Sequence, residues 1–199
     1  MAFVTTALPA AADNGFSAEL LLGSADQELT ASDSVDSIKL SDNSMSYGLR
    51  GVYQFNDYFG VELGYQESGE GKKSFIDEFD ATIGTEFETR QINVGLKGTL
   101  PLEGGFSLAG RLGLSSWDFD ADLTDSDFPG VVAELSDSGS DLYYGVGGQY
   151  RFSDKLYMGL EYTRLDVDLG LGDVFDDPTD PVRAKHDVGS IMLSVGWTF

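Results

Sequence analysis

Few residues of this 199-residue chain could do chemistry, and its single histidine, His186, is the first to consider. Ser190 follows four residues later, which in an extended strand places it about 13 Å away. That is too far for a direct hydrogen bond between a nucleophile and its base. Spacing alone leaves other serines open as partners, but a lone histidine with no further catalytic motif is typical of an incidental polar residue. We therefore predict that the chain is not an enzyme and uses no cofactor.

Carboxylates are the other group with chemical potential. Asp118, Asp120 and Asp122 alternate as at the start of a calcium-binding loop. However, Leu123 stands where such a loop needs glycine, and Pro129 where it needs glutamate. The chain also has no cysteine, which excludes thiolate-ligated metals and disulfides. No dedicated metal site is predicted; the acidic segments either stay solvated or bind divalent cations loosely.

The composition limits both partners and fold. Acidic residues outnumber basic ones 34 to 12, giving a net charge of −22, which excludes a basic nucleic-acid surface. No apolar run approaches the ~20 residues of a membrane-spanning helix. Glycine (25 residues) and aromatic side chains (12%) are abundant, which favours strands and turns over helices.

Apolar residues recur with a period of two from Phe16 onward, which predicts strands. Eight such segments can be delimited, at about 16–23, 46–55, 61–66, 91–100, 106–115, 142–152, 156–163 and 190–199. One face of each is rich in Leu, Val, Ile, Phe and Tyr, whereas the other carries Gly, Ser, Thr, Gln, Asn and a few charges. Each segment therefore has one apolar and one polar face.

The connections between these segments alternate in length. Three are tight turns, at 56–58, 101–105 and 153–155, and four are long, at about 26–44, 67–89, 117–140 and 166–186. All the short connections then fall at one end, as in transmembrane barrels with short periplasmic turns and long extracellular loops. The long connections hold most of the acidic residues, so we expect an acidic outer rim.

Two barrel types fit eight alternating strands. A soluble lipocalin-like barrel has an apolar interior, whereas a membrane barrel has an apolar exterior and a polar lumen. Small and charged residues on the polar face suit the narrow lumen of an eight-stranded barrel. Aromatic residues also gather near both ends of the segments, as membrane interfaces favour. The sequence thus predicts an all-β fold, an eight-stranded antiparallel up-and-down transmembrane β-barrel.

Seven charged residues share the polar face of the strands and are predicted to form a network in the lumen. They are Glu19, Arg50, Glu62, Lys97, Arg111, Arg151 and Glu161. An unpaired buried charge would be costly, so the acids and bases should pair. Such a network either plugs the barrel or forms the gate of a narrow channel.

Two arginines, Arg90 and Arg164, are predicted to point outward from the barrel, at the loop end of their strands. A charge on the lipid face is tolerated only near the interface. These residues either contact lipopolysaccharide phosphates or simply extend to water.

Both ends of the chain carry export features. Residues 1–12 are small and apolar, with an Ala10-x-Ala12 pattern, and are interpreted as the remnant of a signal peptide before a barrel domain at 13–199. The closing residues alternate hydrophobics and end in an aromatic, through Leu193, Val195, Trp197 and Phe199.

With this ending, the chain resembles the OmpA/opacity type of small eight-stranded outer-membrane barrel over essentially all of 13–199. The resemblance implies that the closing residues are an assembly signal read by the barrel-assembly machinery. It also implies a polar interior that obstructs free diffusion.

The sequence thus predicts an integral protein of a Gram-negative outer membrane, in contact with its lipid and lipopolysaccharide. Its loops would be extracellular, its termini periplasmic, and its role envelope integrity or surface interaction. A narrow pore for small solutes and a loop-mediated adhesin are the alternatives. No motif identifies an external ligand.

Overall fold

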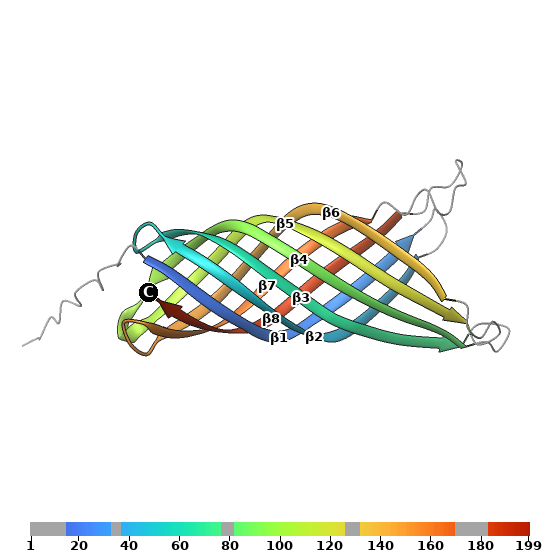
Figure 1. Cartoon of the computed structure of the whole chain (residues 1–199), viewed down its shortest axis with the longest axis horizontal. Coiled ribbons are helices and arrows are strands. Elements are labelled where there is room, and N and C mark those ends of the chain that lie inside the picture. Colours follow the sequence, from blue (N-terminus) through green and yellow to red (C-terminus); the bar gives the residue numbers. More distant parts are fainter. Residues whose placement is uncertain (1–14, 33–36, 77–81, 126–131, 170–182) are drawn as a thin grey trace, which may run out of the picture.

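The chain folds into one closed barrel of antiparallel strands (Figure 1). A computed structural model describes residues 15–32, 37–76, 82–125, 132–169 and 183–199. Strands neighbouring in sequence pair in space, and β1 pairs with β8 to close the sheet. The expected eight-stranded up-and-down barrel is confirmed. The predicted signal remnant at 1–12 lies outside the described residues.

The strands are long and of similar length. They are β1 (Gly15–Ser32), β2 (Ser37–Gln54), β3 (Phe59–Ile76), β4 (Thr82–Pro101), β5 (Phe106–Asp125), β6 (Val132–Arg151), β7 (Leu156–Leu169) and β8 (Arg183–Thr198). A single 3₁₀ turn, η1 (Glu103–Gly105), lies between β4 and β5. The described residues include no helix long and apolar enough to cross a membrane.

Three tight turns join the strands at the end where β1 begins and β8 ends, here called the short-turn end (Figure 1). In the β2–β3 turn, the Asn56 side-chain oxygen accepts hydrogen bonds from the backbone N–H groups of Tyr58 and Phe59, at 2.9 Å each. In the β4–β5 turn, Gly104 and Gly105 adopt φ values of 74° and 84°, which only glycine adopts without strain. Local turn chemistry thus fixes the expected tight connections.

The apolar face of the predicted strands lies outside the barrel. Leu20, Leu63, Leu96, Leu112 and Leu160 are each more than half exposed. A belt of exposed leucines on a water-soluble barrel would be strongly unfavourable, but in a bilayer hydrocarbon replaces water there. We call this part of the barrel the membrane section.

Beyond the membrane section the strands continue where the sequence predicted long connections. The expected connections at 26–44, 67–89 and 117–140 are largely strand, so this prediction was wrong in extent; of the connection at 166–186, residues 166–169 and 183–186 are strand and the rest lies outside the described residues. A strand of 20 residues such as β5 runs roughly 65 Å, about twice what a bilayer crossing requires. Half of the barrel therefore projects beyond the membrane, and we call that half the projecting section.

On β5, β7 and β8 the apolar phase reverses between the two sections, so a single apolar phase does not mark the full length of these strands. On β5, Leu112 and Leu114 point outward, whereas Trp117 and Phe119 point inward and are 3% and 4% exposed. The outward positions next to them are then taken by acids, including Asp118. The alternation of side chains continues unbroken, but the apolar face moves from outside to inside because water replaces lipid outside. A pattern search that follows one apolar phase ends the strand at this point.

The reversed positions form a compact interior that we call the apolar layer. It consists of Ala25, Trp117, Phe119, Ala121, Tyr143, Leu165, Val167 and Val188, from five strands. These side chains share the inside of the projecting section with buried polar side chains, among them Gln27, Ser44 and Thr89, which hydrogen-bond to one another.

Candidate functional site: the charge cluster in the barrel lumen

Charged side chains from six strands meet inside the membrane section. Glu19, Arg50, Glu62, Lys97, Arg111 and Glu161 are all buried, none more than 7% exposed, and we call them the charge cluster. Each occupies an inward position beside residues with small side chains. Arg50, for example, pairs across the β2–β3 ladder with Gly64, which leaves room for the guanidinium.

Arg50 is the centre of the charge cluster. Its Nε donates to Glu19 Oε2 at 2.6 Å. Its Nη1 and Nη2 donate to the two carboxylate oxygens of Glu161, both at 2.8 Å. Such a bidentate pair fixes the relative position of the two groups as well as neutralising them. Arg50 therefore ties β1, β2 and β7 together across the lumen.

Arg111 bridges the remaining acids. Its Nη1 donates to Glu62 Oε2, and its Nε donates to Glu161 Oε2 at 3.1 Å. Lys97 Nζ donates to Glu19 Oε1 at 3.3 Å. Three acids thus face three bases, and the charge cluster is neutral when every group is ionised. This balance is what a charged group in a dry interior requires.

Two tyrosines complete the network, and the sequence did not single them out. The Tyr143 hydroxyl donates to Glu62 Oε1 at 2.6 Å, and the Tyr157 hydroxyl donates to Glu19 Oε1 at 2.7 Å. Tyr157 has the same inward parity as Glu161, four residues on, which was the available signal. Tyr143 lies between the outward Leu142 and Tyr144, and its parity was equally readable.

Arg151 is the predicted lumen residue that lies outside the charge cluster. It is exposed at the end of β6 and donates to the backbone oxygen of Asp154 at 3.1 Å. Its guanidinium carbon lies 5.8 Å from the centre of the Tyr157 ring. Its inward parity is as expected, but it sits at the short-turn end, too far along the strand to reach the acids.

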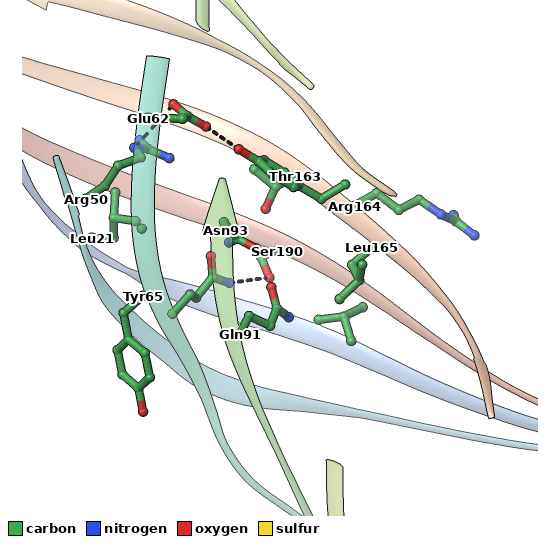
Figure 2. A pocket seen from close by; sticks show the side chains of 14 residues that line it. Leu21, Arg50, Glu62, Tyr65, Gln91, Asn93, Thr163, Arg164, Leu165 and Ser190 are labelled. Carbon is green, nitrogen blue, oxygen red and sulfur yellow. Dashed lines mark hydrogen bonds and ion pairs between the residues drawn. The ribbon is translucent and has the colours of Figure 1, made fainter. Parts of the chain in front are cut away.

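A small cavity of about 20 Å³ separates the charge cluster from the apolar layer (Figure 2). Gln91, Asn93 and Ser190 line it, and Ser190 Oγ accepts a hydrogen bond from Gln66 Nε2 at 3.1 Å. The Nε2 atom of Gln91 and the Oδ1 atom of Asn93 have no partner within the described residues. A cavity of this size, lined by polar and apolar side chains, has room for about one water molecule, not for a solute.

His186, the candidate base, is fully buried in the projecting section. Its Nε2 lies 3.1 Å from Thr89 Oγ1, and its ring lies 4.8 Å from the ring of Phe119. Burial lowers the pKa of His186 to about 4. Ser190 is also buried, and its Oγ accepts a hydrogen bond from Gln66 rather than from the histidine. The described part of the chain thus gives this imidazole no accessible nucleophile.

The described residues contain no group of three or more His, Asp or Glu side chains that could hold a metal ion. Asp118, Asp120 and Asp122 alternate on the outer face of β5 as part of a strand. Their extended backbone separates successive carboxylates by a two-residue rise, which does not converge on one ion.

Arg90 and Arg164 point outward near the start of the projecting section, and Figure 2 shows Arg164 directed away from the lumen cavity. Each is engaged by acids of its own chain. Arg90 Nε donates to Glu88 Oε1 at 2.7 Å, and Arg164 Nη2 donates to Asp187 Oδ2 at 3.1 Å.

The carboxy-terminal residues lie on the outer face at the barrel seam. Leu193, Val195, Trp197 and Phe199 are 39% to 73% exposed. The Phe199 backbone N–H donates to the Phe16 backbone oxygen at 3.0 Å, and the two rings lie 5.9 Å apart. The last residue thus takes part in closing β8 against β1.

Comparisons with known proteins agree with this geometry. A family model described as outer membrane protein beta-barrel domain matches residues 1–199. No curated protein matches the chain. Among solved structures, OprG from Pseudomonas aeruginosa is similar with a TM-score of 0.62 and 19% identity, covering 94% of this chain and 97% of that one.

Two further solved structures show how varied this architecture is in use. Ail, the attachment invasion locus protein of Yersinia pestis, in complex with the heparin analogue sucrose octasulfate, has a TM-score of 0.54 and 22% identity over 93% of this chain and 99% of that one. The outer membrane protease OmpT from Escherichia coli has a TM-score of 0.53 and 11% identity over 98% and 99%. At these identities the likeness shows the fold alone. From its family match and its closed barrel with an apolar outer belt, the chain belongs to the outer membrane β-barrel family and is an integral protein of the outer membrane.

Proposed function

We propose that this protein is a non-enzymatic outer-membrane barrel with a closed lumen, which acts through the surface of its projecting section. The observation that carries the proposal is the charge cluster, in which Arg50 and Arg111 bridge three carboxylates across the lumen. The projecting section above it is filled as well, by the apolar layer together with buried polar side chains such as Gln27 and Thr89. A solute would have to break both.

The alternative, a narrow pore, requires the charge cluster to act as a gate. Conductance of the refolded protein in planar bilayers separates the two functions. A closed barrel gives no discrete conductance steps, and the Arg111→Ala variant also stays at baseline because the filled projecting section still closes the lumen. Discrete steps in the wild-type protein, abolished or enlarged by Arg111→Ala, would establish the pore instead.

The outer rim sets the chemistry of a surface partner. Outward positions of the projecting section carry Asp118, Asp120, Asp122 and Asp166. This surface repels polyanions such as the sulfated sugar analogue that is bound by Ail. A surface role of this chain, in adhesion or in envelope integrity, therefore points to a cationic partner. Retention on a cationic resin that is lost at high salt, with no retention on heparin, is the expected result; heparin binding would contradict it.

The proposed orientation places the termini and short turns in the periplasm and the projecting section outside the cell. It rests on the general asymmetry of outer-membrane barrels. An epitope inserted between residues 126 and 131 should be labelled by antibody on intact cells. Labelling only after permeabilisation would reverse the orientation.

The same proposal includes a contact of Arg90 and Arg164 with lipopolysaccharide phosphates. These phosphates would compete with the carboxylates that already pair with the two arginines. The double variant Arg90→Ala, Arg164→Ala tests it directly. Reduced lipopolysaccharide affinity supports the contact, and unchanged affinity means that these arginines serve only the neighbouring carboxylates.

The assembly role of the closing residues is likewise proposed. Phe199→Ala should slow membrane insertion by the barrel-assembly machinery more than it slows spontaneous refolding into detergent. Equal slowing of both would mean that Phe199 acts only through seam packing against Phe16.

A further inference from the structure

We propose that the lipid-facing surface of β5 to β8 binds one phospholipid that carries a primary ammonium headgroup, of the phosphatidylethanolamine class. The site is an open groove of about 340 Å³ near the short-turn end. Its walls are apolar and include Leu102, Phe106, Leu108, Tyr150, Met158 and Leu160. The proposal needs the bilayer location of the barrel but neither the proposed orientation nor the closed lumen.

The floor of the groove is made by a glycine at an outward position. Gly148 lies between Leu108 on β5 and Leu160 on β7 in the strand registers, both of which are outward and more than half exposed. A Cβ atom at Gly148 would have no atom within 4 Å, so the missing side chain leaves real space. In a bilayer an apolar depression is filled by hydrocarbon, and an acyl chain is the hydrocarbon present.

Aromatic and flexible side chains bound the groove at its short-turn end. The rings of Phe106 and Tyr150 lie 4.7 Å apart and pack as one wall. Met158, paired with Tyr150 across the β6–β7 ladder, is an adaptable apolar contact for a chain of variable shape. An acyl chain that enters along this wall leaves its headgroup at the level of the turns.

Charges of both signs stand at that level: Glu103 on the β4–β5 turn, and the neighbouring Asp154 and Lys155 on the β6–β7 turn. Glu103 follows the lining residue Leu102 in the β4–β5 turn, and Lys155 precedes Met158 by three residues in the β6–β7 turn. The two turns are close, because a Cβ at Gly105 would lie 3.1 Å from the backbone oxygen of Arg151. Glu103 and Lys155 are exposed, and within the described residues no ion pair engages either of them.

Charges of both signs at this level favour a headgroup that itself carries both. A phosphate is complementary to the Lys155 ammonium, and a primary ammonium is complementary to the Glu103 carboxylate, to which it donates hydrogen bonds. A phosphatidylcholine headgroup has the positive charge but no N–H donor, and a phosphatidylglycerol headgroup has no positive charge. The order of preference should therefore be ethanolamine over choline and glycerol.

The chain offers a matched control for the acyl-chain part of the site. Gly110 is also an outward glycine of the membrane section whose Cβ would meet nothing within 4 Å, but it does not line the groove. Gly148→Leu fills the groove, whereas Gly110→Leu adds the same side chain to the lipid face next to it. For the headgroup, Glu103→Gln removes the carboxylate, and Asp57→Asn in the β2–β3 turn removes a charge at the same end of the barrel.

Native mass spectrometry of the refolded protein, titrated with each lipid in detergent, tests the proposal. We expect one saturable adduct with phosphatidylethanolamine. Gly148→Leu should weaken it about tenfold or more, equivalent to about 1.4 kcal/mol, with Gly110→Leu unchanged. Glu103→Gln should remove the preference over phosphatidylglycerol while Asp57→Asn keeps it.

Equal effects of the two leucine variants, or equal adducts with all three lipids, would overturn the proposal. A dimer that Gly148→Leu abolishes would assign the groove to a second copy of the chain and overturn it as well. Conductance steps in bilayers would refute the closed lumen without touching this result, so the two failures are distinguishable.

Discussion

The strongest test of the charge cluster is to remove Arg50 and then restore the balance of charge. Arg50→Met deletes the hydrogen bond to Glu19 and both bonds to Glu161. It leaves three buried acids facing two bases. Breaking a buried pair in this way typically costs about 3–5 kcal/mol, because the remaining carboxylate stays buried without its partner.

The second variant, Glu161→Gln in the Arg50→Met background, makes the charge cluster neutral again. Its cost should fall well short of the sum of the two single variants, with an interaction energy of roughly 2 kcal/mol or more. Urea unfolding of the protein refolded into lipid vesicles, followed by tryptophan fluorescence, measures each free energy. A double-variant cost equal to the sum would show that Arg50 and Glu161 are not coupled, and a single-variant cost below about 1 kcal/mol would show that the lumen is hydrated rather than dry.

Three further changes test other parts of the barrel. Gly113→Ala should lower the free energy of unfolding by about 1–3 kcal/mol in the same assay. The added Cβ would lie 2.3 Å from a backbone oxygen and 2.6 Å from Tyr143. An unchanged stability would mean that β4 and β5 can separate there. Val167→Asp should lower the free energy of unfolding by about 3 kcal/mol or more, because it places a polar group in the apolar layer. The control Asp166→Val, on the outer face of the same strand, should change the free energy of unfolding by less than about 1 kcal/mol. Because the folded-state pKa of His186 is lowered to about 4 from an unfolded value near 6.5, the unfolded chain binds the proton first as the pH falls. Stability should therefore decline from about pH 6.5 to pH 4 by roughly 3 kcal/mol, a decline that His186→Gln removes; the same pH slope in both proteins would refute the assignment.

The fold could be predicted because one periodicity is repeated eight times. Leu96, Leu112 and Leu160 each sit in a stretch where only the outward positions are apolar, and the structure exposes all three. The tight turns were equally readable, since asparagine and paired glycines favour them. Strand order then follows from chain order, because short connections only allow neighbours to pair.

The sequence predicted only in part which charged residues contact one another in the lumen. The alternation of side chains along each strand placed Arg50, Glu161 and Arg111 in the lumen. It does not give the position of each residue along the barrel axis. Arg151 has the right parity and lies too close to the short-turn end to join them. Pairwise distances depend on the stagger between strands, and a single sequence does not reveal the stagger.

The projecting section could not be predicted from a single apolar phase, because the solvent outside the barrel changes from lipid to water along each strand. An apolar face marks the side that avoids water, and that side is outward in a bilayer and inward above it. On β8, Ile191 faces outward while Val188, three residues earlier, faces inward, although the backbone alternates without a break. A reversal of apolar phase within continuous alternation is therefore the sequence mark of the level at which a barrel leaves the membrane. On β5 the change falls between Leu114 and Trp117, on β7 between Tyr162 and Leu165, and on β8 between Ile191 and Val188. These changes assign the bilayer boundary from the chain itself, and they place Arg90 and Arg164 beside it, at a level of the outer face where a charge can reach water without crossing hydrocarbon.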